Sequence, residues 1–98
     1  MPAYVIVNVS TKNAAEYEEY KKMAQDAVAQ FGGRYLVRGG NMKVLEGQWM
    51  PTRLVVLVFE SFERARDWWE SEQYAPAKAL RQRLSETDMV LVDGYEGA

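Results

Sequence analysis

Residues 53–60, Arg-Leu-Val-Val-Leu-Val-Phe-Glu (RLVVLVFE), give the strongest β-strand signal in the chain and decide its fold. The run is apolar and rich in β-branched residues, and it is too short for an ordinary helix. Side chains alternate between the two faces of a strand. One face carries Val55, Leu57 and Phe59, and the other carries Leu54, Val56 and Val58. Both faces are therefore apolar, and both need a cover in the folded protein.

The first strand, predicted over residues 4–9 (YVIVNV), repeats this pattern. Valines occupy one of its faces, whereas Tyr4 and Ile6 occupy the other. A single layer of helices covers only one face of a sheet. Because closed two-fold dimers are the commonest oligomers, we predict that a second copy of the chain covers the other face. Two four-stranded sheets would then face each other in a dimeric α/β barrel.

The remaining segments complete the order β-α-β-β-α-(α)-β. Asn13 and Glu16 form a capping-box-like start of a first helix, which ends at Gly32 and Gly33. Further strands are predicted over residues 34–38, 42–46 and 89–93, with a hairpin turn at 39–41. A second helix is predicted after an N-cap at Ser61, and a third from Pro76 to about Leu84. In the helix after Ser61, the predicted buried stripe is Phe62, Ala65 and Trp69, with Trp68 on its flank. This order is that of the ferredoxin-like split βαβ, an α+β fold with a four-stranded antiparallel sheet, here in one domain over residues 1–98.

Composition excludes several kinds of chemistry. The chain has no cysteine and no histidine, which excludes disulfides, thiol nucleophiles, imidazole bases and the common zinc and haem ligands. We therefore expect neither a metal site nor a cofactor. The net charge of −2 argues against nucleic-acid binding, and no apolar run reaches the roughly 18–20 residues of a membrane span. No signal-peptide pattern opens the chain, so we expect a cytoplasmic protein.

Several motifs together resemble a known family. They are YEEY (17–20), FGGRYLVRGG (31–40), Glu46-Gly47 with Trp49 and Pro51, residues 53–59, SFERARDWWESEQY (61–74) and AKALR (77–81). In this order they closely resemble the family called domain of unknown function 1330, in the dimeric α/β-barrel group. The resemblance implies relatives that include cofactor-free monooxygenases, lactone isomerases and proteins without an assigned role. The chain has Val58 where family members often carry an acidic residue, which leaves an enzymatic role uncertain.

Three arginines and one glutamate are the charged candidates for a site. Arg81 falls within the apolar stripe of the last helix, where its guanidinium would hold a carboxylate or phosphate of a ligand, or pair with a nearby Glu. Arg38 ends a strand beside two glycines and would clamp an anion or pair with Glu46. Arg53 could add a second positive charge at the same opening. Glu46 is the weak candidate for a catalytic acid–base group, the alternative being an exposed glutamate paired to arginine.

Three uncharged residues complete the candidate ligand-binding set. Asn8 is the polar residue of the first strand, where its amide would meet a ligand, a neighbouring backbone or water. Trp49 and Tyr74 lie outside the regular elements, so they could wall a small-molecule pocket or anchor a subunit interface.

The sequence therefore favours a homodimer that binds a small anionic or enolic organic molecule between the sheet and the loops. One alternative is a cofactor-free enzyme of the monooxygenase or isomerase type. Another is an interaction module without a ligand.

Overall fold

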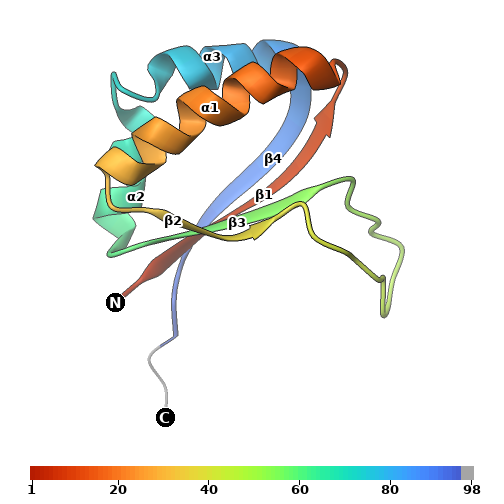
Figure 1. Ribbon diagram of the computed structural model, residues 1–98. Helices are drawn as coiled ribbons and strands as arrows, with labels where there is room; N and C mark the ends of the chain where they lie inside the picture. The colour runs from red at the N-terminus through yellow and green to blue at the C-terminus, as the bar shows by residue number, and fades with distance from the viewer. Residues whose placement is uncertain (96–98) are drawn as a thin grey trace.

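A computed structural model describes residues 1–95 of the chain as a four-stranded sheet covered by three helices (Figure 1). The elements are β1 (Ala3–Thr11), α1 (Ala14–Gln30), β2 (Arg34–Arg38), β3 (Leu54–Phe59), α2 (Phe62–Glu70), α3 (Ala75–Leu84) and β4 (Ser85–Asp93). All strand pairs are antiparallel, and the strand order is β2-β3-β1-β4. The predicted ferredoxin-like α+β fold is confirmed.

The helices cover one face of the sheet, which we call the inner face. Val5 of β1 is paired with Leu57 of β3 on one side and with Leu91 of β4 on the other. The buried inner-face residues of β1 and β3 are Ala3, Val5, Val7, Val9, Val55, Leu57 and Phe59. They pack against Tyr17, Ala24, Ala27 and Val28 of α1 and Ala65 and Trp68 of α2. The two sets of side chains that alternate in residues 4–9 and 53–60 therefore lie on opposite faces of the sheet, as predicted.

The opposite face of the sheet, the open face, has no cover within the described chain. Its apolar side chains include Ile6 at 39% exposure, Val90 at 59% and Val92 at 42%. Ile6 pairs with Val56 on one side and with Val90 on the other, so these side chains form one continuous patch. The expectation of two apolar faces is therefore met in the folded chain.

Helix α1 begins and ends as its sequence predicts. The Asn13 side chain accepts a hydrogen bond from the backbone N–H of Glu16 at 3.0 Å, and its amide donates to the Glu16 carboxylate at 3.1 Å. After the helix, Gly32 adopts φ of 75°, a conformation that favours glycine. Gly33 then passes close to the core, where a Cβ would lie 2.6 Å from the Phe59 ring.

The buried tryptophan of α2 is Trp68, so the predicted placement of Trp69 in the core is wrong. Trp68 is 2% exposed, whereas Trp69 is 40% exposed. Both positions lie near the face defined by Ala65, at spacings of three and four residues. Stacking with Tyr74 (ring centroids 4.4 Å apart) and packing against Phe59 (5.2 Å) select Trp68.

The predicted strand over residues 42–46 is also wrong. The chain between β2 and β3 forms an extended loop, residues 40–52, which we call the arm. Strand β2 pairs with β3 directly, through Arg38 and Val55, and forms the sheet edge. Residues 42–46 have the composition of a strand, but no neighbouring strand pairs with them through backbone hydrogen bonds in the described chain. By contrast β4 starts at Ser85, before the predicted Met89, because α3 leads into it without a loop.

Candidate functional site

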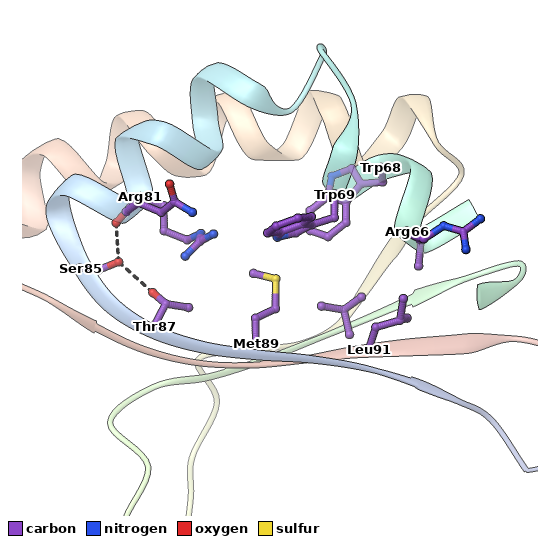
Figure 2. Close-up of a pocket in the computed structure, with 11 residues that line it drawn as sticks. Arg66, Trp68, Trp69, Arg81, Ser85, Thr87, Met89 and Leu91 are labelled. Atoms are coloured by element: carbon purple, nitrogen blue, oxygen red, sulfur yellow. Dashed lines mark hydrogen bonds between the residues drawn. The ribbon is translucent and has the colours of Figure 1, made fainter. Parts of the chain in front are cut away.

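A cavity of about 550 Å³ lies between helices α2 and α3 and strands β1 and β4 (Figure 2). This volume is in the usual range of small-molecule sites, roughly 300–1,000 Å³. The apolar part of its wall comprises Val5, Ala65, Trp68, Trp69, Met89 and Leu91. Figure 2 shows Met89 and Leu91 rising from β4 toward the tryptophans of α2. The cavity therefore offers an aromatic and aliphatic surface to a ligand.

Arg81 of α3 brings a positive charge to this apolar cavity. The residue is only 5% exposed, and its guanidinium points into the cavity toward Trp69 (Figure 2). Its Nε–H donates to the Tyr74 hydroxyl at 3.4 Å, a long hydrogen bond to a neutral group. Within residues 1–95 no carboxylate lies within ion-pair distance of Arg81. A buried cation without a counterion is the group that an anionic ligand would complement.

The position of Arg81 is fixed by the junction of α3 and β4. The Ser85 hydroxyl donates to the Arg81 carbonyl at 2.7 Å and lies 2.9 Å from the Thr87 hydroxyl. Both hydroxyls line the cavity with Arg66 and Gln82. The polar groups of the cavity are thus held on a helix end and a strand, so their positions are well determined.

Tyr74 connects Arg81 to helix α1. Its hydroxyl lies 2.8 Å from that of Tyr20, and Tyr74 itself is fully buried. Burial, together with the neighbouring Tyr74 phenol, raises the pKa of Tyr20 far above its ordinary value. Tyr20 is therefore protonated at neutral pH and acts as a hydrogen-bonding phenol, not as a base.

A second hollow of about 390 Å³ opens at the surface beside α1 and is mostly basic. It is lined by Glu18, Lys21, Lys22, Gln25, Arg38 and Arg53. Arg38 donates to the Gln25 side chain at 3.1 Å and lies 4.2 Å from the Tyr35 ring centroid. The Arg53 guanidinium rests on Gly39, where a Cβ would be only 2.9 Å away. Lys21, Arg38 and Arg53 also line a narrow space of about 30 Å³ that extends into the core.

Tyr17 and Tyr35 line that narrow space. Burial raises the pKa of both hydroxyls, although nearby arginines oppose the shift. The narrow space is large enough for water alone. The basic hollow of about 390 Å³ also lies in the volume range of small-molecule sites, but its lining side chains are all charged or polar, whereas the Arg81 cavity adds an apolar wall.

The structure divides the predicted site residues among four places. Arg81 lines the large cavity with the buried Tyr74 behind it, and Arg38 and Arg53 meet at the basic hollow. The Asn8 side-chain oxygen accepts hydrogen bonds from the backbone N–H groups of Thr52, at 2.9 Å, and Arg53, at 3.3 Å. A neighbouring backbone therefore meets this amide. Glu46 and Trp49 lie exposed on the arm, away from the cavity linings.

Ser85, Thr87 and Trp69 line the large cavity but were not among the predicted site residues. The sequence did hold a signal for the first two. Ser85 and Thr87 precede Met89 and Leu91 at a spacing of two residues, which places all four on one face of a strand that starts at residue 85.

Among the described residues there is no cluster of three or more side chains suited to a metal ion. None of their helices is long and apolar enough to cross a bilayer.

The fold is that of a ferredoxin-like α+β protein, and the Arg81 cavity lies between its helices and its sheet. The chain belongs to the family described as "Domain of unknown function (DUF1330)", whose model matches residues 2–95. The resemblance inferred from the sequence motifs is thereby confirmed. No curated protein matches the sequence.

Solved structures with low sequence identity share the fold. A protein of unknown function from Rhodopseudomonas palustris aligns with a TM-score of 0.78 at 14% identity, over 98% of this chain and 84% of that one. A dimeric ferredoxin-like protein of unknown function from Jannaschia sp. CCS1 gives 0.68 at 10% identity, over 96% and 100%. SnoaB, a cofactor-independent oxygenase from Streptomyces nogalater, gives 0.64 at 14% identity, over 98% and 95%. At these identities the likeness establishes the fold alone.

Proposed function

We propose that this protein is a cytoplasmic homodimer that binds a small organic anion, a carboxylate or an enolate, in the cavity lined by Arg81. The observation that carries the proposal is the guanidinium of Arg81, which faces a cavity of ligand size and, within residues 1–95, has a neutral phenol as its side-chain partner. An anionic group bound there would make charge-assisted hydrogen bonds in place of that long contact. The apolar wall would hold the carbon skeleton of the ligand.

The dimeric part of the proposal rests on the open face of the sheet. Ile6, Val90 and Val92 expose a contiguous apolar surface there, of the kind that soluble monomers rarely present. The similar Jannaschia protein is described as dimeric, which supports the same arrangement for this chain.

The test measures binding of matched anionic and neutral probes. Isothermal titration would compare benzoate and phenylpyruvate with benzamide, which has a similar ring but no charge. We expect the anions to bind and benzamide to bind more weakly. In Arg81→Gln the dissociation constant of the anion should rise about 10- to 150-fold, which corresponds to the roughly 1.5–3 kcal/mol of a hydrogen bond to a charged group.

Arg83→Gln is the matched control, because Arg83 lies two residues further along α3 with its side chain 66% exposed. It should leave binding unchanged. If the anions bind equally well to wild type and to Arg81→Gln, the proposed role of Arg81 is wrong. If none of the probes binds, the interaction module without a ligand becomes the better description.

An enzymatic function in the same cavity is the second candidate, and the Tyr20–Tyr74–Arg81 chain of hydrogen bonds favours it. The guanidinium of Arg81, positioned by the buried Tyr74 hydroxyl, could stabilise an oxyanion formed in the cavity during proton transfer. Glu46 would play no part from its position on the arm. Turnover of an enolisable acid that falls in Tyr74→Phe but not in Glu46→Gln would support this candidate, and equal rates in all three proteins would contradict it.

A further inference from the structure

The arm exposes large apolar side chains that do not take part in the hydrophobic core of their own subunit. Leu45 is 84% exposed, Met50 is 79% exposed and Trp49 is 63% exposed, and every residue from 41 to 50 is exposed. Connections of this length without regular structure are uncommon in compact domains and are usually functional when present. A tryptophan beside a methionine in water is unfavourable unless another surface covers them.

The base of the arm is firmly held at both ends. At its start, the Gly39 N–H donates to the Leu54 carbonyl at 2.8 Å. At its end, Asn8 accepts from the backbone N–H groups of Thr52 and Arg53. Figure 1 shows the arm, in yellow-green, extending past the end of the sheet and away from the helical layer. The arm thus projects on the side of the open face.

The chain exposes more surface than a compact monomer of its mass. Its accessible surface is 6588 Å², whereas a compact monomer of 11.2 kDa exposes about 5,700 Å². The exposed apolar side chains of the arm and of the open face belong to this surface, which a second copy of the chain would cover. The arm carries one lysine and one glutamate, Lys43 and Glu46, so it has no net positive charge to attract an anionic membrane.

We propose that the arm of each subunit packs against the open sheet face of a second copy of this chain, with Trp49 and Met50 as its anchors. The inference rests on the homodimer proposed above. In addition to the contact between the two sheets, the arm of each subunit would contact the other subunit. Tryptophan is among the residues that most often dominate interface energetics. The arm therefore belongs to the subunit interface and not to the ligand cavity.

Photo-crosslinking tests the contact directly. Trp49 is replaced by the photo-crosslinker p-benzoylphenylalanine in the full chain, and Trp69, the other exposed tryptophan, is replaced in the same way as a control. Irradiation of the position-49 protein should give a band at twice the 11.2 kDa chain mass. Mass spectrometry should place the link on the open face, at Ile6, Val90 or their neighbours. The position-69 protein should give no such link.

A second experiment measures the dimer itself. By analytical ultracentrifugation, Trp49→Ala/Met50→Ala should raise the dimer dissociation constant at least tenfold, while Trp69→Ala should leave it unchanged. A wild-type dimer whose position-49 links are absent or stay within one chain overturns the arm contact but leaves the dimer intact. A monomeric wild type at micromolar concentration overturns both. Neither result affects the anion-binding test at Arg81, which has its own readout.

Discussion

Replacing Arg81 by methionine should remove anion binding while costing the unliganded protein far less stability than the loss of half of a buried ion pair would. Methionine keeps most of the length of the arginine stem, so the packing of this side chain in the cavity wall is largely preserved. What disappears is the guanidinium, which is buried against an apolar cavity and donates at 3.4 Å to the Tyr74 hydroxyl. Tyr74 keeps its shorter contact of 2.8 Å with Tyr20.

The magnitude follows from two opposing contributions. Loss of one neutral-acceptor hydrogen bond lowers the free energy of unfolding by about 0.5–1.5 kcal/mol. Removal of a charge held out of bulk water without a counterion raises it, by up to several kcal/mol in a dry site and by less in a cavity that admits water. We expect a net change between a loss of about 1 kcal/mol and a gain of about 2 kcal/mol. Had Arg81 been half of a buried ion pair, its removal would lower stability by about 3–5 kcal/mol.

Urea denaturation followed by tryptophan fluorescence, at one fixed protein concentration, distinguishes these cases. The concentration must be fixed because dimerisation adds to the apparent stability. Arg83→Met is the control for a charge on the exposed side of α3, where the distance of 3.7 Å to Glu16 indicates a weak pair. A loss of 3 kcal/mol or more in Arg81→Met, equal to roughly 12–24 °C in melting temperature for a domain of this size, would refute the reasoning.

Three other predictions concern the packing around the site. Tyr74→Phe removes the hydroxyl shared by the buried Nε–H of Arg81 and the half-buried hydroxyl of Tyr20, so it should lower the free energy of unfolding by about 1–3 kcal/mol in urea titration. Tyr95→Phe, at a residue 90% exposed, should have no effect, and equal stabilities of the two variants would contradict the Tyr74 contacts. Gly33→Ala forces a methyl against a buried ring and should lower the melting temperature by an amount equivalent to about 1–3 kcal/mol, whereas Gly40→Ala meets nothing within 4 Å and should not. Because burial raises the pKa of Tyr17 and Tyr35, the native state holds their protons at a pH where the unfolded chain loses them. The stabilisation is therefore complete below about pH 10 and is lost as the pH rises through the native pKa values, so a urea midpoint constant from about pH 9 to 11.5 would count against this burial.

Local interactions explain why much of the fold could be predicted. The cap of α1 needs only Asn13 and Glu16, three residues apart, and its end needs only two glycines. The apolar alternation of β1 and β3 likewise follows from neighbouring positions in the chain. These features do not depend on which distant segment is packed against them.

The wrong predictions concern segments whose local sequence fits two structures equally well, so that contacts with distant residues decide between them. Trp68 and Trp69 have similar helical spacing from Ala65, and only stacking with Tyr74 selects the first. Residues 42–46 have strand composition, yet the edge strand β2 already pairs with β3. Local propensity alone cannot supply the missing hydrogen-bonding partner.

The candidate site was predictable in part for the same reason. The helical spacing of Arg81 places it in an apolar stripe, and the structure shows it buried there. Its relation to Tyr74 also follows from spacing, because residues seven apart lie two turns along one helical face. The cavity itself did not follow from the sequence, since its opposite wall comes from β4. The separation of Arg38 and Arg53 from Arg81 depends on the same tertiary arrangement.

The position of the first strand has a consequence for synthesis of the protein in the cell. Strand β1 pairs with β3 on one side and with β4, the last strand, on the other. Met89 and Leu91 of that last strand also provide part of the cavity wall. In a growing chain on the ribosome, Arg81 is therefore synthesised before β4 can close the cavity. Until β4 has been made, β1 also lacks one of its two neighbouring strands. Folding of this domain should consequently wait until β4 has left the ribosome. A chain cut before residue 85 would leave one edge of β1 unpaired and would lack the Met89 and Leu91 wall of the cavity.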